Sequence, residues 1–495
     1  MGDDHNQHVK QLGQFPSLEF NNRRSPVYGL NGMVACSQPA ATNAGVDILK
    51  QGGNAVDAAI AIAAALSVTE PCSTGIGGDC FILYYDAVKK ECLGINGSGR
   101  SPSELSLEKV TDTIGNFTKE PIHALSVTVP GAVSGWLKAL SCWGSLPALT
   151  VLSPAIKLAK EGFAVAPLTA HSWSIGMGQL MKSPERNRQS LLIDGKAPSA
   201  GEIFRNLSLA ERIQVLELPP NGQGLATLLA LNFLRDIDIQ ALGHNTASYL
   251  HHCIEAMRLA FQDARRYIGD PDDSEKVPPL NAFLSEEYAK ERRALISPSK
   301  RNTSIQHGIP LAHSDTVSFQ VVDAAGNAVS MVNSNYMGFG TGLIPLGEGF
   351  TLQNRGACFS CDPNHPNCVN GGMTLENGDL HSSFSLMGGF MQPQGHLQIL
   401  LNQLEFGMNP QEAIDAPRFC ISANTENEEV SLEEGICNSV CAELYEMGHP
   451  IVRGVSGFNR QLFGRSQIIR RTISHNQVVL VGGSDGRGDG CAFGF

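Results

Sequence analysis

Alternating apolar and polar positions mark two adjoining strands late in the chain. The runs Val317–Val322 and Ala328–Val332 are rich in β-branched residues, and the segment between them, Asp323–Asn327, has the composition of a turn. This pattern predicts a β-hairpin. Its first strand begins at Thr316, directly after a polar stretch, residues 297–315, whose composition is typical of an exposed loop.

Helical periodicity predicts two consecutive helices near the beginning of the chain. The first, Ala40–Lys50, stops at a Gly-Gly pair, and Asn54 is suited to cap the second, Ala55–Ser67, which is apolar on nearly every side and therefore expected to be buried. The glycines between residues 75 and 78 lack the spacing of a phosphate-binding loop and predict a tight, close-packed turn. The other predicted elements are the strands Met33–Pro39 and Cys80–Tyr85 and the helices Leu225–Leu234, Ser248–Tyr267, Gln398–Phe406 and Pro410–Ala416.

Composition narrows the classes of function. The 495 residues are 42% apolar and 17% charged, as in globular proteins, and the net charge of −12 without a long basic run disfavours nucleic acids and anionic membranes as partners. Thirteen scattered cysteines favour free, mostly buried thiols. The first residues lack a signal-peptide pattern, and the longest apolar run, Ala55–Val68, is too short to cross a bilayer, so a cytoplasmic location is expected.

Thr316 is the candidate for chemistry in the hairpin. A threonine hydroxyl is a weak nucleophile until a base takes its proton, and its own α-amine, freed by a cut before it, can be that base. Such an amine has a reference pKa of about 7.7–8.0, so a useful fraction is neutral near pH 7. The alternative interpretation is a strand whose first residue happens to be β-branched.

A family resemblance favours the first interpretation. Together with Phe339-Gly340-Thr341-Gly342, the hairpin resembles the processing and nucleophile segment of the γ-glutamyltranspeptidase (glutathione hydrolase) family. The variant Asn333–Gly340 is closer to the GGT-like branch, which also resembles cephalosporin acylases and oxamate amidohydrolase. The resemblance extends over nearly the whole chain from Met33.

The resemblance implies a fold and a maturation step. The fold expected is α+β, a four-layer αββα sandwich of the N-terminal-nucleophile hydrolases. The chain is expected to cleave itself between Asp315 and Thr316. A large part, residues 1–315 with the first 30 loosely held, and a small part, residues 316–495, would form one domain and remain together as a heterodimer.

The resemblance also assigns roles to single residues. Thr316 is expected to be the nucleophile, Gly388 and Gly389 the oxyanion donors, and Ser334 a hydroxyl beside the nucleophile. Without the resemblance, the glycine pair predicts an ordinary turn, and Ser334 is equally suited to face solvent. The two residues expected to contact the substrate are Arg100, which would hold an acyl-side carboxylate, and Tyr336; a solvated loop arginine is the alternative for Arg100.

The function expected is amide hydrolysis through an acyl-enzyme on Thr316, with transfer of the acyl group to an amine as a further outcome. The substrates expected are small acyl amides, among them glutathione-like ones, and no cofactor or metal is expected. Two other patterns compete weakly. The set Cys358, Cys361, His365 and Cys368 has zinc-ligand types in tight spacing, and Gly482–Gly486 matches G-x-S-x-G by chance, because no helix follows it.

The sequence also departs from the family pattern. Ala357 and Cys358 stand where true transferases carry a carboxylate for the substrate's α-amino group, and two blocks of the family pattern are missing, one between Phe204 and Pro219 and one near Gly371-Gly372. A packed layer that loses an element exposes apolar surface. The rival hypothesis is therefore an inactive, unprocessed relative or splice form with an incomplete pocket, acting as a binding or structural protein.

Overall fold

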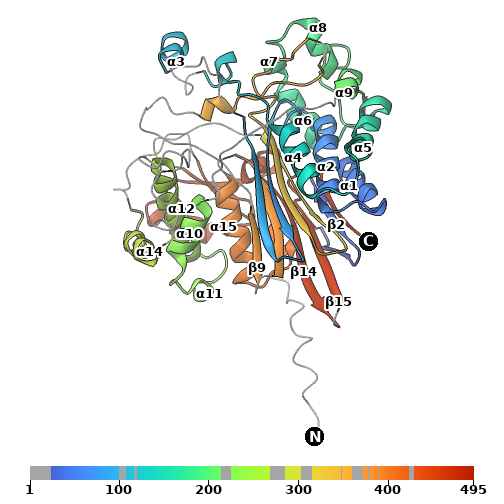
Figure 1. Ribbon diagram of the computed structural model, residues 1–495. Coiled ribbons are helices and arrows are strands. Elements are labelled where there is room, and N and C mark those ends of the chain that lie inside the picture. Colours follow the sequence, from blue (N-terminus) through green and yellow to red (C-terminus); the bar gives the residue numbers. More distant parts are fainter. Residues whose placement is uncertain are drawn as a thin grey trace.

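The computed structural model describes residues 24–99, 107–115, 120–212, 225–267, 285–302, 315–346, 348–358, 372–376, 379–389, 391–422, 429–475 and 477–495. Two stacked β-sheets lie between helical layers (Figure 1). This is the α+β, αββα arrangement expected from the sequence.

The predicted hairpin forms the centre of the first sheet. This sheet has six strands in the order β16-β2-β7-β8-β3-β4, with every neighbouring pair antiparallel. The turn after β7 is held by Asp323, whose Oδ1 accepts hydrogen bonds from the backbone N–H groups of Ala325 and Asn327 at 3.0 and 2.9 Å. The strands are β2 (Met33–Cys36), β3 (Asp79–Asp86), β4 (Glu91–Gly97), β7 (Asp315–Val322), β8 (Ala328–Tyr336) and β16 (Cys491–Gly494).

The second sheet stacks on the first and has five strands in the order β1-β15-β14-β10-β9. Its strands are β1 (Val27–Gly29), β9 (Gly372–Glu376), β10 (Asp379–Met387), β14 (Arg465–Ser474) and β15 (Gln477–Ser484). Polar contacts cross the space between the sheets, because Gln320 of β7 donates through Nε2 to Ser385 and accepts from Ser383, both on β10. Smaller sheets are formed by β5 (Phe163–Ala164) with β6 (Ile203–Phe204), and by β11 (Phe419–Ile421), β12 (Val430–Glu433) and β13 (Ile451–Val455).

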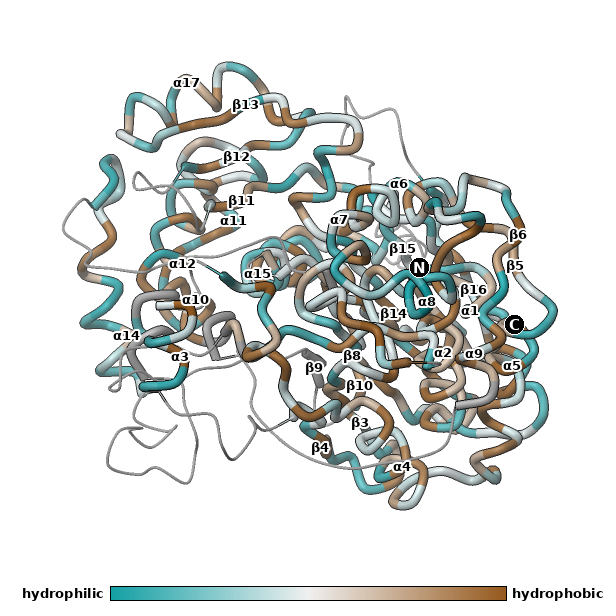
Figure 2. The backbone as a smooth tube through the Cα atoms, turned by 90° about the horizontal axis from the view of Figure 1, so that it is seen from above, coloured by the Kyte–Doolittle hydropathy of each residue, from teal (hydrophilic) through white to brown (hydrophobic). Residues whose placement is uncertain are grey.

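Helices cover the outer face of each sheet. On the first sheet lie α1 (Pro39–Lys50), α2 (Ala55–Thr69), α4 (Ala132–Trp143) and α5 (Ala148–Glu161), which share one apolar core with β2, β3, β7 and β8. On the second lie α15 (Met391–Leu404) and α16 (Pro410–Asp415). A further core is built onto α15 by four helices at the periphery, α10 (Leu225–Leu234), α12 (Ala247–Tyr267), α14 (Glu286–Arg293) and α17 (Asn438–Glu446). Figure 2 shows α14 as largely hydrophilic. The other α-helices within the described residues are α3 (Leu107–Ile114), α6 (Pro167–Ile175), α7 (Met177–Leu180), α8 (Glu185–Arg188), α9 (Leu207–Arg212) and α11 (Ile239–Leu242).

The buried helix α2 confirms the reasoning from its sequence. All of its residues are buried, and Asn54 caps it, since its Oδ1 accepts from the N–H groups of Val56 and Asp57 at 2.9 and 3.1 Å. The Asp57 carboxylate accepts in return from the N–H of Asn54, which completes a capping box.

Two predicted boundaries are wrong. The strand predicted as Met33–Pro39 ends at Cys36, because Pro39 is the first residue of α1, where its missing N–H costs nothing. The helix predicted as Gln398–Phe406 instead begins at Met391. Pro393 is tolerated there because it lies in the first turn, and apolar periodicity missed this turn because the buried face of the helix is partly polar.

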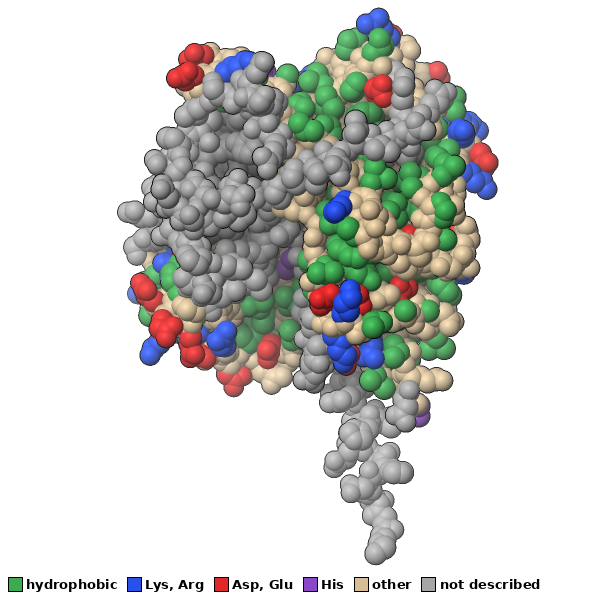
Figure 3. All heavy atoms as spheres, in the orientation of Figure 1, with side chains coloured by type: hydrophobic (Ala, Val, Ile, Leu, Met, Phe, Trp, Pro, Cys, Tyr) green, Lys and Arg blue, Asp and Glu red, His purple; other side chains and the backbone are tan. Residues whose placement is uncertain are grey.

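The described surface shows mixed charge. Figure 3 shows acidic and basic side chains interspersed on one face of the molecule. Among the helices within the described ranges, none is both long enough and apolar enough to span a bilayer. Six of the cysteines in these ranges are buried and form no disulfide there, as expected: Cys36, Cys72, Cys80, Cys253, Cys420 and Cys441.

Candidate active site

Thr316 and Ser334 meet at the end of the β7–β8 hairpin. The pairing of the two strands shifts between Asp315 and Val317, the residues on either side of Thr316. Such a bulge re-aims side chains and is common next to active sites. Oγ1 of Thr316 lies 2.9 Å from Oγ of Ser334, and both side chains are buried, with 2% of their surface exposed. The two hydroxyl residues singled out in the sequence are thus in direct contact.

Tyr336 ends β8 in an unusual conformation. Its φ of 76° lies in the left-handed region, which costs a non-glycine residue roughly 1–3 kcal/mol and is found preferentially at functional sites. In this conformation its backbone N–H donates to Oγ of Ser334 at 2.9 Å. The hydroxyl that contacts Thr316 is therefore itself held in place by the backbone.

A glycine-rich turn packs against the end of β8. A Cβ on Gly78 would lie 2.4 Å from the carbonyl oxygen of Ser334, so only glycine allows this approach. The N–H of Asn335 donates to the carbonyl of Ser73 at 3.2 Å. The predicted close-packed turn is confirmed, and it positions the residues around Ser334.

Gly388 and Gly389 form the turn between β10 and α15. Both have positive φ, 137° and 57°, and a Cβ on Gly388 would come within 2.8 Å of the Cα of Gly464. Before the turn, the N–H of Leu386 donates to Nε2 of His396 at 3.0 Å. Burial lowers the pKa of His396 to about 4, so this ring is a neutral acceptor at pH 7. The glycine pair thus precedes the N-terminus of α15, a helix of 14 residues, and the hydrogen bond from Leu386 to His396 connects this helix to β10.

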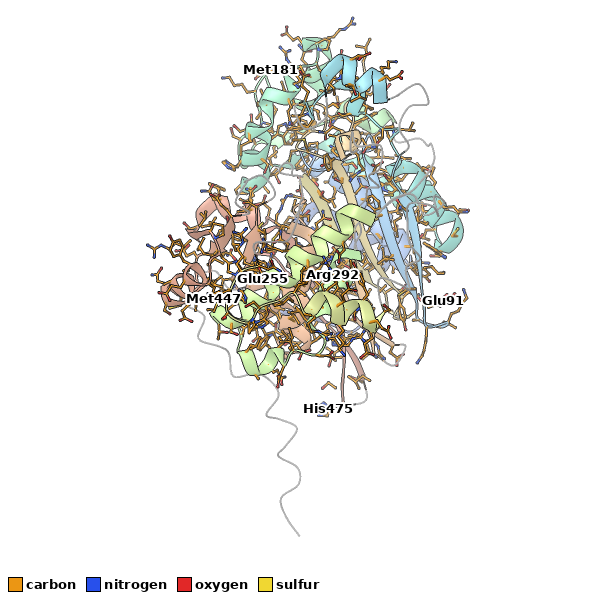
Figure 4. The ribbon with its side chains drawn as sticks, turned by 90° about the vertical axis from the view of Figure 1, so that its left-hand side faces the viewer. Glu91, Met181, Glu255, Arg292, Met447 and His475 are labelled. Carbon is orange, nitrogen blue, oxygen red and sulfur yellow. The ribbon has the colours of Figure 1, made fainter. Side chains whose placement is uncertain are left out.

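The glycine turn and the hydroxyl pair lie at the same end of the two sheets. Figure 4 labels Glu91, at the β3–β4 turn, and His475, at the β14–β15 turn, both in the lower half of the molecule. Ser334 pairs with the end of β3 remote from Glu91, and Met387 pairs with the end of β14 remote from His475.

An ion pair at this end connects β14 of the second sheet with Glu70, the residue that follows α2. Arg465, the partner of Met387, lies 3.0 Å from the carboxylate of Glu70, and Glu70 opens the turn that supports Asn335. Both side chains are buried. The arrangement therefore places backbone donors of one sheet and hydroxyls of the other around one end of the sandwich.

A second buried ion pair lies beside the hydroxyls. Asp79, which pairs with Ser334 across β3 and β8, accepts from Nε of Arg355 at 2.6 Å and from Nε2 of Gln353 at 2.7 Å. Burial raises the pKa of Asp79, and Arg355 offsets part of that rise. The sequence analysis missed both residues. The available signals were an acidic residue directly after two glycines and a lone arginine in a segment of small and polar residues.

We expect the Ser334→Ala variant to mature more slowly than wild type by a factor of about 10² or more, because Thr316 loses its hydroxyl partner. Ser334→Thr retains an oxygen at this position and is expected to mature at close to the wild-type rate. A time course on denaturing gels after rapid purification measures both rates. Equal rates for Ser334→Ala and wild type would exclude a role for this hydroxyl in cleavage.

Some candidate sites predicted from the sequence lie outside the described residues, and others are excluded by the structure. Arg100 lies outside them, as does most of the Cys358–Cys368 segment proposed as an alternative zinc site. Within the described ranges no group of three or more metal-ligating side chains occurs. Ser484, of the G-x-S-x-G match, lies at the end of β15 and is followed by turns and β16, not by a helix, so this match is not a nucleophile elbow.

Comparison with known proteins identifies similar sequences over most of the chain. The sequence profile described as Gamma-glutamyltranspeptidase matches residues 41–214 and 211–495. The glutathione hydrolase-like YwrD proenzyme of Bacillus subtilis (strain 168) is 30% identical, covering 94% of this chain and 99% of that protein. The acylase ACY 1 proenzyme of Pseudomonas sp. (strain SE83) is also 30% identical, covering 88% of this chain and 90% of that protein.

A solved structure is similar in fold. The crystal structure of cephalosporin acylase from Bacillus halodurans superimposes with a TM-score of 0.84 at 35% identity, covering 97% of this chain and 98% of that one. The alignment with the Bacillus subtilis protein spans 536 positions, more than the 495 residues of this chain, so that relative carries segments that this chain lacks. The two profile matches meet at residues 211–214, within the segment Phe204–Pro219 where this chain lacks a block of the family pattern.

Proposed function

The chain belongs to the gamma-glutamyltranspeptidase family of amide-cleaving N-terminal-nucleophile hydrolases, and from this premise we propose that Thr316 is its nucleophile and the bond before Thr316 its maturation site. The observation that carries the proposal is the 2.9 Å contact between the buried hydroxyls of Thr316 and Ser334. It supports a role for Ser334 as the group that orients the Thr316 hydroxyl for attack.

Maturation uses the same hydroxyl as turnover. Oγ1 of Thr316 attacks the carbonyl carbon of Asp315, the C–N bond breaks, and the nitrogen takes up the proton that the hydroxyl releases. The resulting ester between Asp315 and Thr316 is hydrolysed by water. The products are a carboxylate on Asp315 and a free α-amine and hydroxyl on Thr316.

In turnover the new α-amine of Thr316 acts as the base. It accepts the hydroxyl proton as Oγ1 attacks the amide carbon of a substrate, and it passes this proton to the leaving amine. The acyl group is then an ester on Thr316. Water releases it as the acid, and an amine acceptor would instead take it as a new amide.

Gly388 and Gly389 are proposed to stabilise the negative charge of the tetrahedral intermediate. Their N–H groups precede α15, and the N-terminus of a helix carries roughly half a positive elementary charge. One lost oxyanion donor typically costs a factor of about 10²–10³ in rate. Arg100 is proposed to hold a carboxylate on the acyl side, and Tyr336 to contact the substrate.

The two cleavage products are proposed to remain one heterodimeric domain. In the first sheet β2, β3 and β4 precede residue 316, whereas β7, β8 and β16 follow it. β2 pairs with both β7 and β16, and β3 pairs with β8, so backbone hydrogen bonds connect the two parts along three strand pairs of this sheet. Cutting one peptide bond removes none of these bonds.

The substrates are proposed to be small acyl amides. The relatives named above are a glutathione hydrolase-like protein and an acylase, which favours γ-glutamyl and related acyl groups. Incubation with γ-glutamyl and glutaryl p-nitroanilides tests this. We expect p-nitroaniline release and, after an acid quench, a small part heavier by one acyl group at Thr316. Folded, cleaved protein that neither releases amine nor carries the acyl group would contradict the proposal.

A further inference from the structure

Two cysteines lie opposite each other on neighbouring strands of the first sheet. Cys36 is the last residue of β2, Cys491 is the first residue of β16, and the strand register pairs these two residues directly. Directly opposite residues of an antiparallel pair have side chains on the same face of the sheet. Cys36 is buried and Cys491 is partly exposed. The two thiols are therefore neighbours, and solvent reaches one of them.

Both side chains point to the helical layer. Cys36 belongs to the core between the first sheet and its helices, whereas its neighbour Ala35 belongs to the core between the two sheets. On β16, Phe493 has the same parity as Cys491, and its ring centre lies 5.4 Å from Nζ of Lys50 in α1. The pair of thiols therefore lies between the sheet and α1.

The strand register brings the two cysteines close to disulfide geometry. Opposite residues of an antiparallel pair have Cα atoms about 4.5–5.5 Å apart, and a disulfide joins Cα atoms about 4.4–6.8 Å apart. The Cβ atoms of such a pair are about 4.5–5.5 Å apart, against about 3.5–4.5 Å in a disulfide. Closing the bond therefore requires the side chains to approach by about 1 Å.

The position of β16 makes this approach feasible. β16 is the edge strand of its sheet, where β2 is its only neighbour among the described strands. A Cβ on Gly490 would lie 2.1 Å from the carbonyl oxygen of Cys36, so glycine allows the two backbones to come unusually close just before Cys491. A disulfide closed with some strain is reduced more readily than a relaxed one, so the bond would be reversible.

We propose that Cys36 and Cys491 are a redox-sensitive pair that a small disulfide compound, such as oxidised glutathione, converts into a disulfide between β2 and β16. Cys36 belongs to the part before residue 316 and Cys491 to the part after it, so the bond joins the two parts of a cut chain covalently. This joining rests on the proposed cleavage before Thr316, whereas formation of the bond does not.

The bond forms by two exchange steps. The thiolate of Cys491 attacks one sulfur of the small disulfide, whose S–S bond breaks, and one small thiol leaves. Cys36 then attacks the sulfur of Cys491, and the second small thiol leaves. Two protein thiols are oxidised, one small disulfide is reduced to two thiols, and the leaving thiolates take up the two protons. Burial raises the pKa of Cys36, which suits this thiol to the second step, where the proximity of Cys491 compensates for its small thiolate fraction.

The test is peptide mapping of protein incubated with oxidised glutathione and then alkylated. In wild type we expect a peptide containing Cys36 linked to one containing Cys491, and we expect dithiothreitol to separate them. On a non-reducing denaturing gel, oxidised cut protein should run as one band that dithiothreitol converts into two. Cys491→Ala and Cys36→Ala should each abolish the linked peptides and the joined band. Cys92→Ala, which removes an exposed cysteine of β4, is the matched control and should behave as wild type.

The uncut Thr316→Ala protein separates this inference from the proposed function. The linked peptides should form in it to the same extent as in wild type, because the pairing of β2 with β16 does not depend on the cut. Wild type that carries glutathione on Cys491 but yields no linked peptides would overturn the inference. A joined band that persists in both Cys491→Ala and Cys36→Ala would also overturn it, whether or not Thr316 proves to be the nucleophile.

Discussion

Replacing Thr316 with alanine is expected to leave the purified protein as one polypeptide of 495 residues, where wild type gives two. The same variant should lose amide turnover by a factor on the order of 10⁴ or more, as when the nucleophile of a hydrolase is removed. Both effects have one cause, because a single hydroxyl attacks the chain first and the substrate afterwards. Denaturing gels report the first effect, and p-nitroaniline release reports the second.

Thr316→Ser is the matched control for this experiment. It keeps the hydroxyl 2.9 Å from Ser334 and removes only a methyl group, so the protein should still be cut. Thr316→Ala protein that is cut at the same bond would assign the attack to another group. Uncut Thr316→Ala protein that retains turnover would separate maturation from catalysis.

The second large effect is expected from a buried charge cluster in the small part. Arg487 lies between two carboxylates, with Nη2 2.5 Å from Glu433 and Nη1 3.0 Å from Asp485, and all three side chains are at most 1% exposed. Arg487→Met removes one positively charged partner from each of these two buried carboxylates. The free energy of unfolding is therefore expected to fall by about 3–5 kcal/mol.

Urea unfolding of the Thr316→Ala protein measures this loss on a single chain. Arg453→Met, at an exposed position of β13, is the control and should stay within about 0.5 kcal/mol of its parent. A loss below about 1 kcal/mol for Arg487→Met would show that the cluster adds little to stability.

The same cluster predicts how stability depends on pH. Burial raises the pKa of Asp485, but Arg418 and Arg487 outweigh burial and lower it to about 2. In the unfolded chain an aspartate has a pKa of about 3.9, so the stabilisation is fully present above about pH 4 and is lost as the pH falls towards 2. Circular dichroism between pH 7 and pH 2 should show acid unfolding of Arg487→Met at a higher pH than that of its parent.

The hairpin and the helices with clear periodicity were predictable from local patterns. The β-branched runs on either side of Asp323–Asn327 and the capping residue Asn54 are local signals, because each lies within a short stretch of sequence. The start of α15 was not predictable from such signals, because its first turn contains Pro393 and its buried face includes Gln394 and His396. Apolar periodicity cannot detect a helix that buries amides.

The candidate site was predictable only in part. The contact between Thr316 and Ser334 follows from hairpin pairing and the family pattern, but the bulge that aims Thr316 depends on the register of two strands. The pairing of Asp79 with Arg355 joins residues 276 positions apart. Such contacts arise from the tertiary fold, and no local pattern encodes them.

The most direct test of the central claim is the intact mass of the purified wild-type protein. The account predicts two polypeptides, one ending at Asp315 and one beginning at Thr316, whose masses together exceed that of the whole chain by one water. Well-folded protein that hydrolyses amides while it remains a single unbroken chain would contradict it.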